Sequence, residues 1–321
     1  IGGLEVARVG DDDRMMELKR KVASGKAFGT NVKMISAAEA KALFPLLEED
    51  MIQGAMWDPD AGLVKPRSQT VAGILVDNAV KTGQAQSWAN TNAIGLDIKD
   101  GRIVGVDTSR GYIAAEHVIV CAGLWGRTIA EMAGEDLPVM PVDHPLAFFG
   151  PYTEFEGTGK DIGYPLMRDQ GNSAYMRDTG DPSTPEGGQI EWGYYEEKEP
   201  RLLHPRNLPE KGETHWSPSQ RDLELDQIME PLERAMELTP ILGEIGYNEK
   251  HSFNGLLQVT TDGNPSVGES VLTRGLWYAI GVWVKDAPGI AKVLVDWMTD
   301  GVATMDFNGI DTARHYPIQK T

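Results

Sequence analysis

Hydrophobic positions follow two periods along this chain, and the two periods separate expected strands from expected helices. Residues 276–284 form a short, almost continuous apolar run, which is typical of a strand covered on both faces. Residues 285–289 then break the run and supply helix-start chemistry, with Asp286 as the expected N-cap and Pro288 in the first turn. Apolar residues next recur at helical spacing, namely Ile290, Val293, Leu294 and Trp297. The pattern predicts a strand, a sharp turn and a helix.

The same two periods predict the remaining elements. Ser36 and Glu39 form a capping-box pattern at the start of one of the expected helices. Helices are expected at residues 11–25, 37–43, 66–81 and 220–236. Strands are expected at residues 2–9, 87–96, 102–108, 112–114 and 189–195, within 117–126, and as a pair of short strands within 164–181. Residues 138–149 are expected to lead from one domain into the other. Residues 196–213 are expected to form a long loop on the surface.

Composition and charge narrow the class of protein. The chain has 321 residues, of which 41% are hydrophobic, so it can bury one large core or two modest ones. A net charge of −18 argues against nucleic-acid binding and is interpreted as a solvated surface. No apolar run is long enough to span a membrane and no signal peptide is evident, so we expect a soluble, cytoplasmic protein, with the mitochondrial matrix as the alternative.

The only cysteine is Cys121, which rules out an internal disulfide and fits a reducing compartment. It stands in an apolar strand, so a buried structural thiol is expected rather than a nucleophile. The six histidines suggest no metal site. A helix that begins at the carboxyl end of a strand, as near Asp286, offers N–H groups to an anion, although any α/β protein contains such turns.

Several separated segments resemble one enzyme family. FNGLLQVTTDGNPSVGE, GLWYAIGVWVKDAPGIAK and VIVCAGLWG occur in the same order as in the flavin-dependent dimethylglycine oxidase and sarcosine dehydrogenase group of the D-amino-acid oxidase superfamily. The similarity runs from IGGLEVAR near the start to GIDTARHYP near the end. It implies an α/β flavoprotein with an α+β substrate domain, in which two domains interleave and the Rossmann-type FAD domain is incomplete.

The resemblance also implies domain boundaries and a reaction. The substrate domain would comprise residues 1–54 and 144–258, and the FAD-binding domain residues 55–143 and 259–321. The reaction would be oxidative demethylation of dimethylglycine or sarcosine, with a hydride passing from the N-methyl carbon to FAD. The iminium product would be hydrolysed to formaldehyde or captured by tetrahydrofolate. The electron acceptor and the oligomeric state are left open.

Residues of the pocket follow from the same resemblance. His144 matches a histidine that lines the flavin and substrate pocket, and Tyr175 matches an active-site tyrosine. Tyr194 and Tyr195 should point to opposite faces of a strand, and Tyr195 is the one expected in the pocket. Arg177 is the expected carboxylate ligand; Arg168 is equally near, and both stand beside aspartates that they could pair with.

A second group of residues is expected to hold the cofactor or act beside it. The amides at the start of the helix near Asp286 would meet the reduced flavin ring, and Lys285 would act on oxygen or on the carboxylate unless it pairs with Asp286. Trp125 also fits a packing role. The expected cofactor-binding residues are Ala93, Cys121, Ala122, Gly123, Trp125, Asp286, Ala287, Pro288 and Gly289.

Departures from the family pattern leave alternatives open. No GxGxxG segment, which binds the pyrophosphate of FAD in this superfamily, is present. The sequence is therefore either a fragment of a longer protein or one that has lost this binding segment. The histidine that carries covalent FAD in the relatives would lie in that segment, so the linkage is undetermined. A folate-binding domain would follow the last residues in the longer protein. The alternative functions are a flavin-free binding or structural subunit and a flavin oxidase of another amine or of a 2-hydroxy acid.

Overall fold

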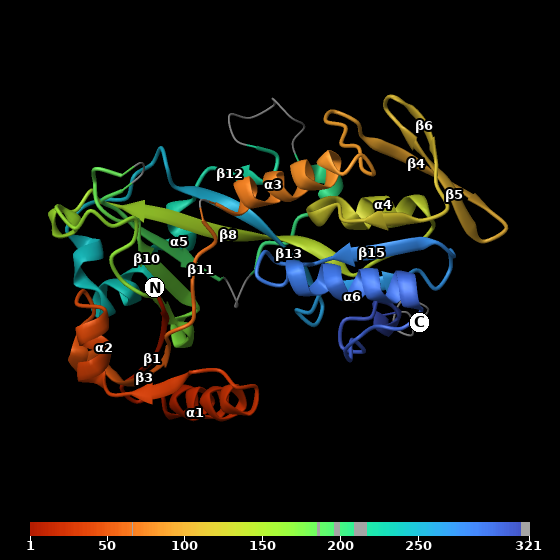
Figure 1. The fold of residues 1–321 in the computed structure, drawn as a ribbon. Coiled ribbons are helices and arrows are strands. Elements are labelled where there is room, and N and C mark those ends of the chain that lie inside the picture. The colour runs from red at the N-terminus through yellow and green to blue at the C-terminus, as the bar shows by residue number, and fades with distance from the viewer. Residues whose placement is uncertain (66, 185–186, 196–199, 209–216, 316–321) are drawn as a thin grey trace. The chain divides into compact units, whose positions relative to one another are not determined.

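The computed structural model describes residues 1–321 except 66, 185–186, 196–199, 209–216 and 316–321 (Figure 1). The chain forms two compact units. Unit 1 comprises Ile1–Leu63, Asp143–Pro200 and Lys211–Gly255, and unit 2 comprises Val64–Val142, Arg201–Glu210 and Leu256–Thr321. The units therefore interleave along the sequence, and the mixed α/β class expected from the sequence is confirmed.

Most of a nine-stranded sheet with the strand order β12-β13-β8-β11-β10-β9-β1-β3-β2 belongs to unit 1, and parts of β8 and β13 belong to unit 2. Strands β1 and β9 pair in parallel, while β11 pairs with both β8 and β10 in antiparallel fashion. The strands are β1 (Gly3–Arg8), β2 (Lys33–Ile35), β3 (Ile52–Asp58), β8 (Val139–Phe149), β9 (Leu166–Asp169), β10 (Ala174–Asp178), β11 (Ile190–Tyr194), β12 (Gln220–Arg221) and β13 (Phe253–Thr260).

The two faces of this sheet have different surroundings. On one face, Leu4 and Val6 of β1 join a core that includes residues of helices α2 (Ala37–Leu43) and α5 (Leu225–Leu238). Because side chains alternate along a strand, Glu5 points to the opposite face. There its carboxylate pairs with Lys21 of helix α1 (Asp12–Ala27) at 2.7 Å. We call this second face of the sheet the α1 face.

The helix caps of unit 1 follow local sequence rules. The expected capping box opens α2: the Glu39 N–H donates to Ser36 Oγ at 3.2 Å, and the Ser36 N–H donates to Glu39 Oε2 at 2.8 Å. Asp11 caps α1 through a bond from the Arg14 N–H at 2.9 Å. The predicted helix at 220–236 starts later than expected, because its first two residues form β12 and α5 begins only at Leu225.

Unit 2 contains two three-stranded sheets, β14-β15-β7 and β4-β5-β6. Strands β7 and β15 run parallel, with Leu276 opposite Val118 and Tyr278 opposite Val120. The strands are β4 (Ala93–Lys99), β5 (Arg102–Thr108), β6 (Gly111–Ala114), β7 (Val118–Val120), β14 (Ser266–Glu269) and β15 (Leu276–Ile280), and the helices are α3 (Ser68–Lys81), α4 (Gly126–Met132) and α6 (Ala287–Asp300).

Two expectations for unit 2 need correction. The apolar run 276–284 is not one strand, because Gly281 adopts φ of 72° and turns the chain after Ile280. The helix expected at 66–81 forms as α3, but among its described residues none is buried. No described helix combines the length and apolar character needed to cross a bilayer.

Candidate functional site

A row of side chains on the α1 face links the predicted pocket residues of unit 1. On neighbouring strands, Arg168 lies opposite Tyr175, Tyr175 opposite Gly193, and Gly193 opposite Leu146. His144 precedes Leu146 by two residues on β8 and so points to the same face. Strand order thus gathers on one surface residues that are scattered between positions 144 and 193 of the sequence.

Tyr175 and His144 form a hydrogen-bonded pair. The phenol oxygen of Tyr175 lies 2.8 Å from His144 Nε2, although their strands are separated by β11. The two rings are stacked, with centroids 5.7 Å apart and an interplanar angle of 12°. The two residues that the sequence predicted for the pocket are therefore neighbours in space.

A hydrogen bond from its backbone holds His144 in place, and burial keeps its imidazole uncharged. Its N–H donates to Asn254 Oδ1 at 3.0 Å, and Asn254 in turn donates to Gln227 Oε1 at 2.9 Å. His144 is 8% exposed. Burial lowers the pKa of His144 to about 4, and the nearby backbone of Tyr194 acts to raise this pKa.

The tautomer of His144 follows from its two ring nitrogens. The Nδ1 atom makes no hydrogen bond of normal geometry with the described residues. The backbone of Tyr194 nevertheless raises the pKa of the ring and so favours a proton on it. We therefore assign the ring proton to Nδ1, which leaves Nε2 to accept from the Tyr175 hydroxyl. Burial raises the pKa of Tyr175 above its ordinary value, so at neutral pH both members of the pair are uncharged.

Tyr195 completes an aromatic cluster with this pair. Its ring centroid lies 4.6 Å from that of His144 and 5.4 Å from that of Tyr175. Tyr194 instead lies in the core, where it stacks on Trp192 at 6.2 Å. The opposite orientation of the two tyrosines agrees with the strand period, and the structure brings Tyr195 to the pocket residues.

The two arginines near the cluster differ in their partners. Arg177 forms an ion pair with Glu191, which lies directly opposite on β11, rather than with the neighbouring Asp178. Arg168 is exposed and makes no hydrogen bond or ion pair with any residue that the structure describes. Its positive charge nevertheless favours the ionised forms of Tyr175 and Tyr195. Arg168 is therefore the guanidinium available to a ligand.

In unit 2, most of the predicted cofactor residues follow two strands at one edge of the sheet β14-β15-β7. Because β7 and β15 are parallel and adjacent, the turns that follow Val120 and Ile280 leave the same edge. Ligands of open α/β sheets bind outside the carboxyl ends of strands. The turn after β7 contains Cys121, Ala122 and Gly123, and the turn after β15 leads to Asp286, Ala287, Pro288 and Gly289.

The space around the two glycines at this edge fits a close ligand. A Cβ added at Gly289 would meet no atom within 4 Å, and one added at Gly123 would meet only Gln258 Nε2 at 3.9 Å. Open space beside the backbone, at the N-terminal end of the 14-residue helix α6, suits the approach of an anionic or flat group. The open backbone at these two glycines leaves room for a cofactor such as FAD, and its binding at this edge stays a prediction.

Individual side chains at this edge differ from expectation. Cys121 is exposed and not buried, because β7 ends one residue before it. Surrounding atoms still raise the pKa of its thiol, which disfavours a nucleophilic thiolate. Trp125 is 40% exposed in the 3-10 turn Gly123–Trp125 that precedes α4. Ala93 does not lie at this edge: it opens β4 in the sheet β4-β5-β6, opposite Thr108.

Lys285 pairs with its neighbour. Its Nζ lies 2.7 and 2.9 Å from the two carboxylate oxygens of Asp286, and it is 5.9 Å from the ring centroid of Trp283. Asp286 occupies the expected N-cap position, but its side chain makes no capping bond. The pairing that the sequence offered as the alternative for Lys285 is thus present, and a catalytic role for this lysine stays a prediction.

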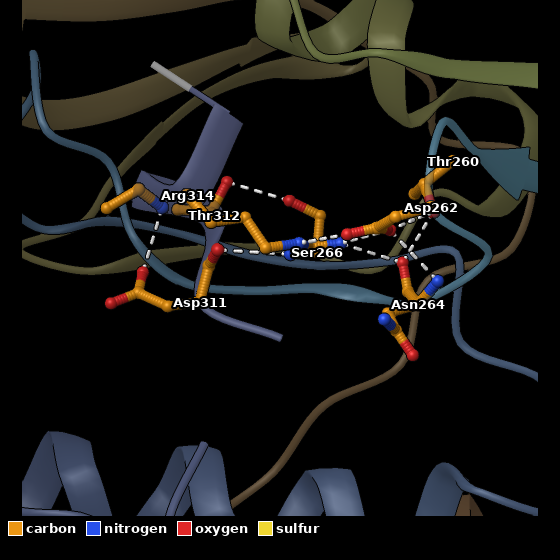
Figure 2. Close-up of polar contacts among 8 residues, drawn as sticks. Thr260, Asp262, Asn264, Ser266, Asp311, Thr312 and Arg314 are labelled. Carbon is orange, nitrogen blue, oxygen red and sulfur yellow. Dashed lines mark hydrogen bonds and ion pairs between the residues drawn. The ribbon is translucent and has the colours of Figure 1, made fainter. Parts of the chain in front are cut away.

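A polar latch, which the sequence did not predict, connects residues 311–314 to the turn at 260–266 (Figure 2). Arg314 Nε and Nη2 donate to the two oxygens of Asp262 at 2.8 and 3.0 Å. Further bonds reach the carbonyl oxygens of Asn264 at 2.9 Å and Asp311 at 3.0 Å. The Arg314 side chain holds the pKa of Asp262 well below its ordinary value.

The latch supports the turn that leads to α6. A Cβ at Gly281 would lie 3.3 Å from Thr260 Cγ2 and 3.4 Å from the Cα of Pro265, so this glycine packs directly on the latched turn. The Gly281 N–H also donates to Gln258 Oε1 at 3.0 Å. No motif signals this arrangement, because its members are separated by about fifty residues.

Comparison with known proteins places these observations in a family. The family model described as FAD dependent oxidoreductase matches residues 1–297. The chain is 27% identical to dimethylglycine dehydrogenase of Rattus norvegicus, over 94% of the chain and 34% of the relative. It is 26% identical to sarcosine dehydrogenase of Homo sapiens, over 98% of the chain and 32% of the relative. The chain thus spans about a third of these curated relatives.

A solved structure supports the fold. L-proline dehydrogenase from P. horikoshii superposes with a TM-score of 0.79 at 22% identity, covering 98% of this chain and 76% of the other. At this identity the likeness concerns the fold alone. The resemblance stated from the sequence, to flavin-dependent amine oxidoreductases with a D-amino-acid-oxidase-like fold, is confirmed by the family match and by these relatives.

Proposed function

Because the chain belongs to the family of FAD dependent oxidoreductases, we propose that it is the catalytic part of an enzyme that demethylates an N-methylated amino acid. Dimethylglycine and sarcosine are the substrates favoured by the names of the relatives. One observation carries the proposal: an uncharged, hydrogen-bonded His144–Tyr175 pair stands beside Arg168, which has no hydrogen bond or ion pair with the described residues.

Arg168 would bind the carboxylate of the substrate. A guanidinium forms two parallel hydrogen bonds with a carboxylate, which fixes both position and orientation. Arg168 and Tyr175 stand opposite each other on β9 and β10, so a substrate held by this guanidinium would lie beside the ring of Tyr175. Arg177 does not serve this purpose in the proposal, because Glu191 already occupies its guanidinium.

The His144–Tyr175 pair would control the proton on the substrate amine. The amine must be uncharged for a hydride to leave the adjacent carbon, and a site with a cation and buried rings disfavours a second positive charge. The ammonium proton would leave to water as the substrate enters the site, and the Tyr175 hydroxyl, held by His144 Nε2, would orient the uncharged amine. The pair needs no charge of its own before the substrate binds.

The cofactor edge of unit 2 completes the proposal. FAD, when bound there, supplies the acceptor for the hydride of the N-methyl carbon. The open backbone at Gly123 and Gly289 and the start of α6 would hold it, and the latch through Arg314 would keep the turn before α6 in place. The substrate is left as an iminium ion, and water converts it to the demethylated amine and formaldehyde. Tetrahydrofolate would capture the one-carbon unit only where the complete protein provides a folate site.

The test uses the complete protein that carries this chain. Its absorbance spectrum should show flavin bands, and anaerobic addition of dimethylglycine or sarcosine should bleach them with release of formaldehyde. The amide of dimethylglycine keeps the amine but lacks the carboxylate charge, and it should bleach the bands far more slowly. A colourless protein would favour the flavin-free subunit. Bleaching by proline or a 2-hydroxy acid, and not by methylated amines, would favour the oxidase of another substrate.

A further inference from the structure

We propose that Gly193 is a positioning residue for the His144–Tyr175 pair: its missing side chain is the space through which Tyr175 reaches across β11 to His144. The catalytic consequence rests on the proposed function. The steric relationship rests on the geometry of unit 1 alone and is tested separately below.

Tyr175 crosses an entire strand to meet its partner. Strand β11 lies between β10, which carries Tyr175, and β8, which carries His144. Gly193 stands directly opposite Tyr175 on β11, and on its other side it stands opposite Leu146 of β8. A side chain at position 193 would therefore project from the sheet between the two members of the pair.

The phenol fills the position of that absent side chain. A Cβ built on Gly193 would lie 2.2 Å from Cζ, 2.3 Å from the hydroxyl oxygen and 2.5 Å from Cε1 of Tyr175. Carbon atoms in contact are normally about 3.5–4.0 Å apart, so even one methyl group requires the ring to move by more than an ångström. The hydroxyl that bonds to His144 is among the three clashing atoms.

The backbone gives no other reason for a glycine here. Gly193 lies inside β11 and is not among the residues with positive φ, so any amino acid could adopt its conformation. Glycine weakens the interior of a strand and often marks the close approach of another group. In this strand the approaching group is the ring of Tyr175.

A displaced ring cannot restore the pair by sliding sideways. The ring of Tyr195 lies 5.4 Å from that of Tyr175 and 4.6 Å from that of His144, so one side is occupied. Any movement of the ring away from position 193 and from Tyr195 carries its hydroxyl away from His144 Nε2. The Nε2 atom of His144 would then lose the hydrogen bond that it accepts from Tyr175.

The first experiment measures flavin reduction in Gly193→Ala by stopped flow, with Gly255→Ala as the matched control. Gly255 is also a strand glycine, and its added Cβ would meet its nearest atom at 3.4 Å, an ordinary contact. We expect the limiting rate of flavin reduction in Gly193→Ala to be at least tenfold lower than in the wild type and equal to that of Tyr175→Phe. The substrate dissociation constant should stay unchanged. Adding Tyr175→Phe to Gly193→Ala should lower the rate no further. A wild-type rate in Gly193→Ala would overturn the proposal.

The second experiment needs neither flavin nor substrate. Denaturation midpoints are compared for Gly193→Ala in the wild-type and in the Tyr175→Ala backgrounds. We expect Gly193→Ala to lower the midpoint only where the phenol is present, because Tyr175→Ala removes the clashing ring. An equal loss in both backgrounds would overturn the steric role even if Gly193→Ala alone proved too unstable to purify. If Gly193→Ala lowers the midpoint only where the phenol is present, but the wild-type protein oxidises no amine, only the proposed function is overturned.

Discussion

Arg177 and Glu191 lie directly opposite each other on β10 and β11 and form an ion pair. This contact uses the guanidinium that the sequence suggested for the substrate carboxylate. The neighbouring Arg168 has no such partner among the described residues and is the arginine opposite Tyr175. The two arginines are nine residues apart, but only Arg177 is held in an ion pair among the described residues.

Arg168→Gln should weaken substrate binding, whereas Arg177→Gln should not. A hydrogen bond to a charged group contributes about 1.5–3 kcal/mol, so loss of Arg168 should raise KM for dimethylglycine by roughly 10- to 100-fold. Arg177→Gln should instead lower stability slightly, because Glu191 loses its partner. Steady-state kinetics with dimethylglycine and with its amide provide the measurement. Equal effects of the two variants on KM would contradict this assignment.

Stability should depend on pH through His144. An unfolded histidine has a pKa near 6.5, and burial lowers the pKa of His144 to about 4 in the folded state. The unfolded state therefore binds the proton first, and stability is lost as pH falls from about 6.5 towards 4, by up to about 3 kcal/mol. Denaturation midpoints across this range should decline less steeply in His144→Gln than in the wild type.

The matched control for that measurement is His251→Gln, because His251 is an exposed histidine. This variant should keep the wild-type slope between pH 6.5 and 4. A protonated His144 also cannot accept the hydrogen bond of the Tyr175 hydroxyl, so flavin reduction should slow over the same range. An unchanged slope in His144→Gln would show that another group controls the acid sensitivity.

The latch should depend on the shape of the Arg314 side chain and not only on its charge. Arg314→Lys keeps the charge but loses the paired bonds to Asp262 and the bonds to two carbonyl groups. We expect Arg314→Lys and Arg314→Gln to lower stability similarly, by about 1–3 kcal/mol, and to retain less FAD after dialysis. Lys292→Gln, which removes an exposed helix pair with Asp296, is the control. If Arg314→Lys retained as much FAD as the wild type, the charge of residue 314 and not the shape of its side chain would be what the latch requires.

Acid should weaken the latch through Asp262. The folded-state pKa of this carboxyl is depressed, so its contribution is present above the unfolded value near 3.9 and is lost as pH falls below it. Asp262 is 40% exposed in its side chain, so solvent screening makes the effect small. The Asp262→Asn variant should lose less stability than the wild type between pH 4 and 2.

Gly289→Ala should separate cofactor binding from folding. The added Cβ meets no protein atom within 4 Å, and alanine favours a helix, so the thermal midpoint without FAD should stay the same or rise. If the flavin approaches this backbone, the methyl group should lower FAD affinity by at least tenfold. Gly281→Ala is the contrasting variant: φ of 72° and the contact with Thr260 should make it less stable with or without FAD. Unchanged FAD affinity in Gly289→Ala would remove this residue from the cofactor site.

Local patterns were sufficient for several elements. The capping box of Ser36 and Glu39 forms as predicted, because its partners are three residues apart and the bonds form within one helical turn. The opposite orientation of Tyr194 and Tyr195 follows from the strand period alone. Resemblance to a family then identified His144 and Tyr175, and the structure places them within hydrogen-bonding distance.

Features that depend on contacts between distant segments were decided only by the tertiary structure. A run of apolar residues does not reveal that Gly281 turns the chain, nor that Cys121 falls just beyond the end of β7. Likewise, Arg177 and Arg168 have the same local surroundings in sequence, and only the register of β10 against β11 assigns Glu191 to one of them. The sequence by itself determined elements, family and candidate residues, since these depend on neighbours along the chain. Strand order determined that a tyrosine passes over a glycine to reach a histidine, because that order brings together residues far apart in the sequence.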